Sequence, residues 1–427
     1  MSKKKKIYIK SMGCKVNLAD AASIVDLLGQ DFFELVDEPG LADGVVLNTC
    51  TVTHKADRDC RKFLGSLSGR FPDLPVIVTG CGAVNQKEKF EEYPNVKKVF
   101  TPGNAQDIAK LLGMERQQGL MPQNPRSSFS RLGRKRAFVK VQDGCDARCT
   151  YCTIPLVRGQ QRSMQKEWVI SEVKRLLDAG HKELVLTGIH LGRYGTDLSS
   201  RTSLAELLDA IAVEFRRRVA RVRLSSVEPQ EWTDELLESI SRHEFVCRHF
   251  HVPLQSGDPE ILKRMARPYT PSQYHKTIDK LRKVFPQASI GADVLVGFPG
   301  ETDKMADTTE DFVDSLALDY LHVFTFSSRP GTRAATMEKK VADITIKERA
   351  KRLRNIGRNK WNSFTCSGLG KFHMLLGEKV LKGHTEGKSE HYRKLKLLNT
   401  NAVGNLVKVR AVSQQGDELL CTVVIGA

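Results

Sequence analysis

Three cysteines within eight residues, Cys145, Cys149 and Cys152, place the strongest constraint on what this 427-residue chain can form. They follow residues 137–141, an apolar run that predicts a strand leading directly into a cysteine loop. Iron–sulfur clusters take cysteine thiolate ligands, normally four, so three thiolates leave one iron of a four-iron cluster without a protein ligand. An open metal position is typical of catalytic sites. The motif therefore predicts a catalytic iron–sulfur centre in this loop.

The alternative interpretation of this loop is a zinc site. Zinc sites usually pair one C-x-x-C with a second pair of cysteines or histidines nearby. No such pair lies within reach of Cys152 in the sequence. The spacing therefore favours the cluster over zinc.

Length and charge narrow the class of protein. A chain of this length predicts two or three domains, and an apolar content of 40% is enough to form their cores. The net charge of +17, from 67 basic and 50 acidic residues, favours a polyanionic partner, nucleic acid first and an anionic membrane second. A basic soluble enzyme without such a partner is the alternative.

Secretion and membrane insertion are not expected. No apolar run approaches the length of a bilayer span, and residues 7–9, after the basic start, are too few for a signal peptide. The ten cysteines do not suggest a disulfide scaffold in a chain of this size. These features predict a cytoplasmic protein with no membrane association, in which clustered cysteines indicate metal binding or catalysis.

The first segment, residues 4–112, alternates expected strands with helices, which predicts an open α/β sheet with parallel strands. The expected strands lie at residues 7–9, 44–48 and 75–80. A helix is expected at residues 19–28, with Asn17 or Asp20 as its N-cap.

Cys14, Cys50 and Cys81 each follow one of these three strands. Ligands of open α/β sheets bind beyond the carboxyl ends of the strands, so the three thiols are expected to converge in a second three-thiolate site. Three buried, inert cysteines are the alternative. The remaining cysteines are interpreted as structural: Cys60, Cys247, Cys366 and Cys421.

Residues 113–135 show no periodic pattern and predict a linker. Its basic end either contacts phosphates or is only solvated, and contains Arg131, Arg134, Lys135 and Arg136. Residues 136–363 then repeat strand and helix on the scale of a (β/α) barrel. The expected strands lie at residues 137–141, 183–187, 221–225, 249–252, 289–296 and 320–324, and helices between them at 167–179 and 271–284. Functional residues should lie at the C-terminal ends of these strands, and a basic helix at 345–362 should connect domains or lie near substrate.

Residues 364–427 change to short β-like runs with glycine between them. These runs lie at residues 372–376, 394–398, 406–412 and 419–425. Several short strands in one small segment predict a β-barrel. Such barrels often bind RNA, and a packing domain is the alternative.

The spacing of the cysteine loop, with aromatic Tyr151 before the third cysteine, resembles that of radical S-adenosylmethionine (SAM) enzymes. The resemblance implies that the open iron chelates the amino and carboxylate groups of SAM. One electron from the cluster then cleaves the sulfonium and yields a 5′-deoxyadenosyl radical. The clusters carry this chemistry, so no catalytic side chain is expected, and His190, His249 and His251 are not needed as acids or bases.

The whole chain resembles the methylthiotransferase family. The best local matches are residues 13–17, 48–50, 79–81, 144–155, 158–163, 225–229, 251–257 and 296–302. The resemblance implies an N-terminal α/β domain with an auxiliary [4Fe-4S] cluster, a partial (β/α) barrel with the SAM cluster, and a TRAM domain. It assigns Cys14, Cys50 and Cys81 to the auxiliary cluster, and the three loop cysteines to the SAM cluster, which is also a [4Fe-4S] cluster.

Within the family, Gly-Cys-Lys-Val-Asn at residues 13–17 is most similar to the branch that acts on N6-threonylcarbamoyladenosine beside the tRNA anticodon. The isopentenyladenosine branch more often has Gln where Lys15 stands. Residues 18–20 and 384–388 depart from the family pattern. The implied reaction adds a methylthio group to C2 of that adenosine, with SAM, two clusters and an electron donor such as flavodoxin or ferredoxin.

Several strand ends are expected to contact SAM, with ordinary turn structure as the alternative for each. These residues are Tyr151, Gly188, Ser226, Glu228, Gln255 and Gly297. Arg158 and Arg162 follow the loop closely enough to contact a substrate phosphate or the SAM carboxylate, and a structural ion pair is the competing interpretation.

Other functions remain compatible with the sequence. The alternatives within the family are isopentenyladenosine in tRNA and an aspartate of a ribosomal protein. A further alternative is another radical SAM reaction on RNA, such as methylation, and a non-enzymatic one is an iron-responsive RNA-binding protein. The sequence carries no signal for an oligomeric state.

Overall fold

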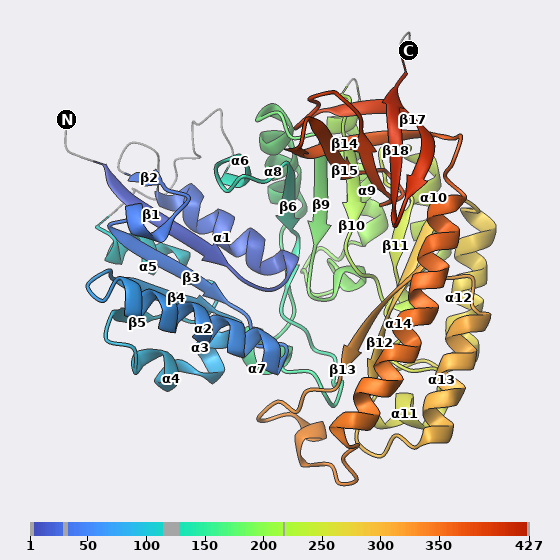
Figure 1. Ribbon diagram of the computed structural model, residues 1–427, viewed down its shortest axis with the longest axis horizontal. Coiled ribbons are helices and arrows are strands. Elements are labelled where there is room, and N and C mark those ends of the chain that lie inside the picture. The colour runs from blue at the N-terminus through green and yellow to red at the C-terminus, as the bar shows by residue number, and fades with distance from the viewer. Residues whose placement is uncertain (1–3, 29–32, 114–127, 217, 425–427) are drawn as a thin grey trace.

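The computed structural model describes residues 4–28, 33–113, 128–216 and 218–424. Three parts follow one another along the chain: an N-terminal α/β layer, a central partial barrel and a small C-terminal β-barrel (Figure 1). The expected three-part architecture is confirmed. Most of the predicted linker lies outside the described residues, and its described end forms the short helix α6 (Ser128–Arg131).

The N-terminal sheet is fully parallel, with strand order β2-β1-β3-β4-β5. Its strands are β1 (Lys5–Ser11), β2 (Phe33–Leu35), β3 (Gly44–Thr49), β4 (Val76–Gly80) and β5 (Val96–Val99). Its helices are α1 (Lys15–Leu28), η1 (Pro39–Leu41), α2 (His54–Arg70), α3 (Cys81–Asn85), α4 (Lys87–Glu91) and α5 (Ala105–Leu111). Every residue of β3 and β4 is buried, because helices cover both faces of a parallel sheet.

Helix α1 begins at Lys15, so the expected N-cap at Asn17 or Asp20 is wrong. Asn17 is buried inside the first turn, where its side-chain amide donates to the backbone carbonyls of Met12 and Thr49. Its polar side chain therefore holds the neighbouring loops together and does not cap the helix.

The central part contains two three-stranded parallel sheets, β10-β9-β6 and β11-β12-β13, joined by a bridge between Val222 and Val246. The strands are β6 (Arg136–Lys140), β9 (Glu183–Thr187), β10 (Arg221–Leu224), β11 (His249–His251), β12 (Ser289–Val296) and β13 (Tyr320–Thr325). The helices are α8 (Lys166–Asp178), α9 (Leu204–Phe215), α10 (Asp234–Arg242), α11 (Pro259–Arg264), α12 (Pro271–Val284) and α13 (Asp303–Ser315). Shorter elements are β7 (Gln142–Asp143), α7 (Ile154–Arg158), β8 (Arg162–Ser163), η2 (Leu191–Arg193), η3 (Pro229–Glu231) and η4 (Arg333–Thr336).

Four helices of the central part begin where a side-chain hydroxyl accepts a backbone N–H of the first turn. Ser203, Thr233, Thr270 and Thr302 serve this role for α9, α10, α12 and α13. These caps hold each helix start at a defined point after the preceding strand. The apolar faces then pack into one core with β6, β9, β10 and β12.

The basic helix α14 (Asp343–Cys366) packs along β13 and α13 and leads into the closed barrel β14-β15-β16-β18-β17 (Figure 1). Its strands are β14 (Phe372–Leu381), β15 (His384–Lys388), β16 (Lys394–Leu397), β17 (Leu406–Gln415) and β18 (Glu418–Val423). Residues 384–388, which match a family turn only loosely, form a strand paired on both sides. Among the described residues, no helix is both long and apolar enough to cross a membrane.

A buried ion cluster joins the C-terminal barrel to the central part. The Glu183 carboxylate accepts from Arg221 at 2.6 Å and from Arg223 at 2.9 Å, and is fully buried. The same guanidinium groups donate to backbone carbonyls of the C-terminal barrel, including those of Met374 and Ser389. The barrel is therefore held by charges that belong to β9 and β10.

Candidate functional site

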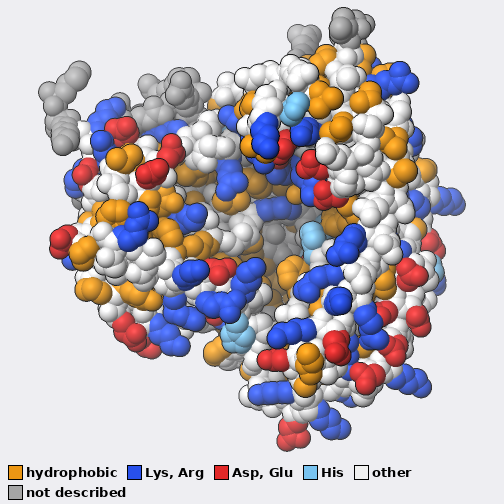
Figure 2. Space-filling view, viewed as in Figure 1, with side chains coloured by type: hydrophobic (Ala, Val, Ile, Leu, Met, Phe, Trp, Pro, Cys, Tyr) orange, Lys and Arg blue, Asp and Glu red, His pale blue; other side chains and the backbone are white. Residues whose placement is uncertain are grey.

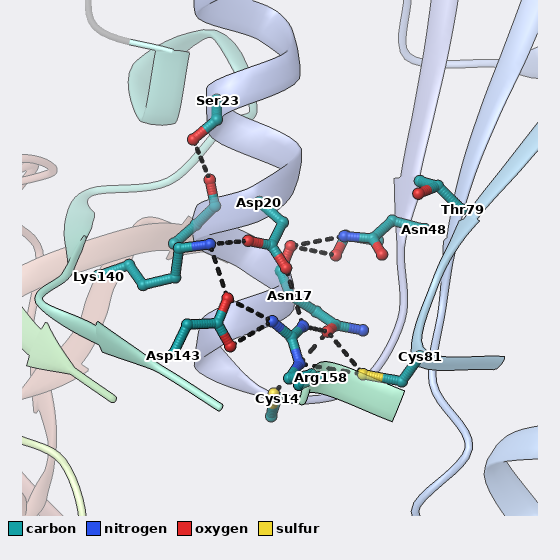
Figure 3. Close-up of polar contacts among 12 residues, drawn as sticks. Cys14, Asn17, Asp20, Ser23, Asn48, Thr79, Cys81, Lys140, Asp143 and Arg158 are labelled. Carbon is teal, nitrogen blue, oxygen red and sulfur yellow. Dashed lines mark hydrogen bonds and ion pairs between the residues drawn. The ribbon is translucent and has the colours of Figure 1, made fainter. Parts of the chain in front are cut away.

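Cys14, Cys50 and Cys81, the strand-end site, follow β1, β3 and β4 and lie close together (Figure 3 shows two of them). The Cys14 and Cys81 sulfurs lie 4.0 and 3.9 Å from the Oδ1 atom of Asn17. At Gly13, an added Cβ would lie 2.9 Å from the Cys50 sulfur. The topology of the parallel sheet thus brings three distant thiols around one buried amide.

Two glycines allow this convergence. Gly13 and Gly80 have φ values of 104° and 92°, in the left-handed region that favours glycine. A Cβ at Gly80 would lie 2.3 Å from the side-chain oxygen of Asn48 and 2.4 Å from the carbonyl oxygen of Thr49. The chain therefore turns sharply into Cys14 and Cys81 while the neighbouring loops stay in contact.

Cys145, Cys149 and Cys152, the loop site, lie between β7 and α7. The Cys145 N–H donates to the Gly159 carbonyl at 3.1 Å, and the Cys152 N–H donates to the Cys149 carbonyl at 3.1 Å. Gly144 precedes the loop with φ 68°, and a Cβ there would lie 1.9 Å from the Gln160 carbonyl oxygen. These backbone contacts fold the loop back on itself.

Each set of cysteines has one guanidinium on one sulfur. The Arg158 Nε donates to the Cys81 sulfur at 3.1 Å, and the Arg267 Nη1 donates to the Cys149 sulfur at 3.2 Å. Burial raises the pKa of the Cys81 thiol to about 12, and Arg158 acts against that rise. Burial also raises the pKa of the Cys149 thiol, and Arg267 opposes it.

Both sets fit thiolate ligands of an iron–sulfur cluster. Reactive free cysteines have a lowered pKa, so buried thiols with a raised pKa are poor nucleophiles on their own. A metal replaces the proton on such a thiol, and an N–H donor on the sulfur stabilises the resulting thiolate and tunes the cluster. The Cys81 and Cys149 thiols therefore agree with metal ligation and disagree with nucleophilic catalysis.

Comparison with known proteins adds to this geometry. The Radical SAM superfamily matches residues 139–313, and an uncharacterized protein family, UPF0004, matches residues 6–101. A Rickettsia prowazekii protein named threonylcarbamoyladenosine tRNA methylthiotransferase MtaB is 34% identical over 426 residues, which cover 97% of each chain. A Bacillus subtilis protein of the same name is 34% identical and covers 95% of this chain and 93% of its own.

This chain belongs to the radical SAM methylthiotransferase family. Membership of the radical SAM superfamily brings SAM and a [4Fe-4S] cluster to the protein as cofactors. Solved structures agree on the fold. The radical S-adenosylmethionine methyltransferase TsrM of Kitasatospora setae has a TM-score of 0.57 at 14% identity, covering 78% of this chain and 77% of its own. The cobalamin-dependent S-adenosylmethionine radical enzyme OxsB has a TM-score of 0.51 at 13% identity, covering 83% and 57%.

In this methylthiotransferase, two of the residues expected to contact SAM follow β10. The Ser226 hydroxyl lies 2.7 Å from Nδ1 of His251, and the Glu228 carboxylate pairs with Arg267. Arg267 is the residue that donates to Cys149, so Glu228 is linked to the loop site through one guanidinium. This link places the end of β10 beside the loop site.

Two other residues expected to contact SAM, Gln255 and Gly297, have a backbone conformation that is unusual for most residues. Gln255 has a φ of 72°, rare for a non-glycine residue, and its backbone pairs with Asp293 and Leu295 of β12. Gly297, with φ 79°, leaves no room for a Cβ, which would lie 2.4 Å from Ile346 of α14.

Gly188 and Tyr151 lie against other side chains of the protein. A Cβ at Gly188 would lie 2.9 Å from the side-chain oxygen of Gln142, whose amide donates to the Gly144 carbonyl. Tyr151 packs against a small apolar cluster that includes Phe298. Gly188 therefore leaves space for the side chain that supports the loop site, and Tyr151 anchors the loop to the core.

The competing interpretations of Arg158 and Arg162 have different outcomes. The Arg158 side chain is 1% exposed and pairs with Asp143 and Asp20, as a structural ion pair would. Arg162 is exposed on β8. Of the basic residues at the end of the expected linker, Arg131 stacks over Phe33 and Arg136 pairs with Glu378.

Sequence reasoning missed one neighbour of the loop site, Arg267, and set another, His190, aside. Arg267 lies 118 residues from Cys149, and no local pattern marks it. The imidazole of His190 lies 3.5 Å from the Cys145 sulfur through Nδ1 and 2.6 Å from the Glu231 carboxylate through Nε2. The position of His190 just after β9 is the only signal in the sequence that pointed to it.

Of the cysteines interpreted as structural, Cys60, Cys247 and Cys421 are buried, whereas Cys366 is exposed at the end of α14. Figure 2 shows a hollow between the N-terminal layer and the central barrel, with Lys and Arg side chains along its sides. The Lys and Arg side chains make the sides of this hollow positively charged.

Proposed function

We propose that this methylthiotransferase adds a methylthio group to C2 of N6-threonylcarbamoyladenosine beside the anticodon of tRNA. The observation that carries the proposal is the pairing of two three-thiol sites, each with a guanidinium on one sulfur. One site suffices for SAM cleavage, so a second one of the same kind supports a reaction that also inserts sulfur.

The chemistry explains why cofactors are needed. The hydrogen at C2 of adenine is unactivated, and side chains acting as acids, bases or nucleophiles do not replace it with sulfur. The cluster at the loop site, with SAM, supplies the one-electron chemistry for this step. The strand-end site would hold the second [4Fe-4S] cluster, and a flavodoxin or ferredoxin would supply the electrons.

Residues of this chain bind and orient the reactants. The six cysteines of the two sites would hold the clusters. Ser226, Glu228, Gln255 and Gly297 follow strands of the central part and would bind SAM, and Arg267 links Glu228 to the loop site. Gly188 and Tyr151 would support this site through Gln142 and the core.

The choice of substrate rests on the relatives and on charge. Both relatives described above carry threonylcarbamoyladenosine tRNA methylthiotransferase in their names. The net charge of +17 and the positively lined hollow suit an RNA substrate. A base must leave its stack to reach a buried centre, and single-stranded loops such as the anticodon loop allow this. Residues 4–112, 136–363 and 364–427 would act as the three domains that hold it.

Mass spectrometry of tRNA nucleosides from cells with and without the gene tests the proposal. We expect the 2-methylthio derivative of N6-threonylcarbamoyladenosine to disappear without the gene and to return when the gene is restored. Loss of the isopentenyl derivative, or of methylthio-aspartate in a ribosomal protein, would assign the enzyme to another substrate. Unchanged products in all three would leave another radical SAM reaction on RNA or the non-enzymatic alternative, and release of 5′-deoxyadenosine from SAM would exclude the non-enzymatic one.

A further inference from the structure

We propose that Arg158 is a positioning residue that ties the two cysteine sites together and raises the reduction potential of the cluster at the strand-end site through its hydrogen bond to Cys81. This inference rests on the proposed function, because it requires a cluster at that site. It goes further by assigning a redox role to a residue outside both sets of ligands.

All three guanidinium nitrogens of Arg158 donate to neighbours in different parts of the fold (Figure 3). Nε donates to the Cys81 sulfur at 3.1 Å, and Nη1 donates to both oxygens of Asp143 at 2.9 and 3.0 Å. Nη2 donates to the side-chain oxygen of Asn17 at 2.6 Å and to Asp20 at 2.8 Å. The planar fork of an arginine is suited to such fixed, multiple contacts.

The contacts of Arg158 reach both sites. Cys81 belongs to the strand-end site, and Asn17 is the amide around which that site is built. Asp143 accepts the N–H of Gly144, the residue immediately before Cys145 in the loop site. Arg158 itself ends α7, the helix that follows the loop. A single side chain therefore contacts groups that belong to both sites.

The charges around Arg158 balance without Cys81. Lys140 donates to Asp20 at 2.5 Å and to Asp143 at 3.1 Å, so two cations face two carboxylates. The bond from Nε to the sulfur therefore acts as a hydrogen bond in a neutral group of side chains. Hydrogen bonds to cluster sulfurs are one of the factors that set reduction potentials, because they stabilise the more electron-rich reduced state. Loss of this bond should make the cluster harder to reduce.

A second arginine offers a matched control. Arg329, which follows β13, donates to the Thr51 hydroxyl at 2.8 Å and pairs with Asp57 of α2, and its side chain is 4% exposed. It holds the same N-terminal layer beside Cys50. Within the part of the chain that the structure describes, Arg329 forms no hydrogen bond to a thiol sulfur. Arg329 thus shares the docking role of Arg158 without the sulfur contact.

The experiment uses full-length protein in which the three loop cysteines are replaced by Ala, so that only the strand-end site can hold a cluster. Anaerobic reconstitution and potentiometric titration followed by electron paramagnetic resonance give its midpoint potential. We expect Arg158→Gln to change the ratio of reduced to oxidised cluster about tenfold at fixed potential, a shift of about 59 mV to more negative values. Arg158→Lys should shift it less. Arg329→Gln combined with Asp57→Asn removes both charges of that buried pair and should leave the potential unchanged.

A double variant separates the hydrogen bond from net charge. Arg158→Gln combined with Asp20→Asn restores the balance of charge but not the donor to Cys81. A potential that stays low in the double variant supports the role of the hydrogen bond. A return to the value of the protein that keeps Arg158 and Asp20 overturns that role. If Arg158→Gln takes up no iron, the shift in Arg158→Lys decides, and no shift there overturns the inference.

The outcome also separates this inference from the proposed function. If the protein with the three loop cysteines replaced by Ala binds iron, and Arg158→Gln leaves its potential unchanged, only the role of Arg158 is overturned. If that same protein, without Arg158→Gln, binds zinc or no metal, the cluster at the strand-end site and this inference are overturned together.

Discussion

The two cysteine sites differ in how the chain builds them. The loop site draws three thiols from eight consecutive residues, whereas the strand-end site draws them from the ends of three parallel strands. The loop site can form when one turn folds, but the strand-end site exists only when β1, β3 and β4 are in register. The loop site is thus a local structure, and the strand-end site is a property of the whole sheet.

The largest expected effect comes from removing one thiol from each site. Cys149→Ala should abolish SAM cleavage and therefore the whole reaction, because the loop site keeps only two ligands. Cys50→Ala should still cleave SAM but form no methylthio product. Measuring 5′-deoxyadenosine and the modified nucleoside in one assay tests both.

Cys366→Ala, which changes an exposed cysteine at the end of α14, serves as the control and should retain both products. Full methylthiolation by Cys50→Ala would remove the strand-end site from the mechanism. Formation of 5′-deoxyadenosine by Cys149→Ala would remove the loop site.

A glycine in each site sharpens the comparison at the level of the backbone. Gly144→Ala places a methyl group 1.9 Å from a carbonyl oxygen, and Gly80→Ala places one 2.3 Å from Asn48. With the left-handed φ added, each should lower the free energy of unfolding by about 2–4 kcal/mol. Iron content should fall at the loop site alone for Gly144→Ala and at the strand-end site alone for Gly80→Ala.

Gly159→Ala is the control for these two variants. Its φ is 74° and its ψ is −159°, a region that almost only glycine adopts, but an added Cβ would meet nothing within 4 Å, so only the backbone cost of about 1–3 kcal/mol applies. Equal iron loss in all three variants would mean that the steric contacts do not decide which site fails.

A smaller effect is expected from Arg267→Gln, which acts only on the loop site. The change removes the donor to Cys149 and leaves the Glu228 carboxylate without its cation. SAM affinity should fall about tenfold, or about 1.4 kcal/mol, with no change in the signal of the strand-end cluster. Calorimetric titration of SAM measures the affinity.

Arg264→Gln provides the comparison for Arg267→Gln, because Arg264 pairs with Glu260 in α11 and donates to the Gly300 carbonyl at 3.3 Å. Among the described residues it has no hydrogen bond to a thiol or to Glu228. The Arg264→Gln variant should bind SAM normally. Equal SAM affinity in Arg267→Gln and Arg264→Gln would mean that the pair of Arg267 and Glu228 does not contribute to SAM binding.

The smallest effect on either cysteine site should come from Glu183, which contacts neither. Burial by itself raises the pKa of Glu183, but the guanidinium groups of Arg223 and Arg221 outweigh burial and hold that pKa well below its usual range. The carboxylate therefore stabilises the fold fully above its unfolded-state pKa of about 4.3, and this contribution is lost as pH falls below that value. Thermal unfolding between pH 3 and 7 should show this fall.

In Glu183→Gln that dependence should disappear. The variant should lose about 3 kcal/mol at pH 7, because two buried guanidinium groups lose their carboxylate. Iron content at both cysteine sites should stay the same. A selective loss at one site would show that the joint to the C-terminal barrel reaches that site.

Local patterns were predicted best from the sequence. The strand before the loop site and the strands before Cys14, Cys50 and Cys81 were visible because each is a compact apolar run. Strand β5 was missed because its central residues are exposed lysines. The start of α1 was placed too late because the buried role of Asn17 depends on loops far along the chain.

Contacts that join distant segments were beyond the sequence. Arg158 lies 77 residues from Cys81, and Arg267 lies 118 residues from Cys149. Neither pairing leaves a periodic or spaced signal. Gly188 and Gly297 were expected to approach SAM, yet each also makes room for a side chain of the protein, Gln142 and Ile346. Small residues at strand ends therefore indicate close packing without indicating what packs there.

The ties at Arg158 and Arg329 also affect the mechanics of the central barrel. Strands β6 and β13 are the outermost strands of their sheets, and neither has a partner on its outer side among the described strands. The N-terminal layer contacts Arg158 of α7 and Arg329 in the loop after β13. It therefore spans the gap between β6 and β13, which a closed barrel would fill with strands. Removing that layer would bare two unprotected sheet margins, which are sites of aggregation. The N-terminal layer thus sets the width of the gap between β6 and β13, although that gap belongs to the central barrel.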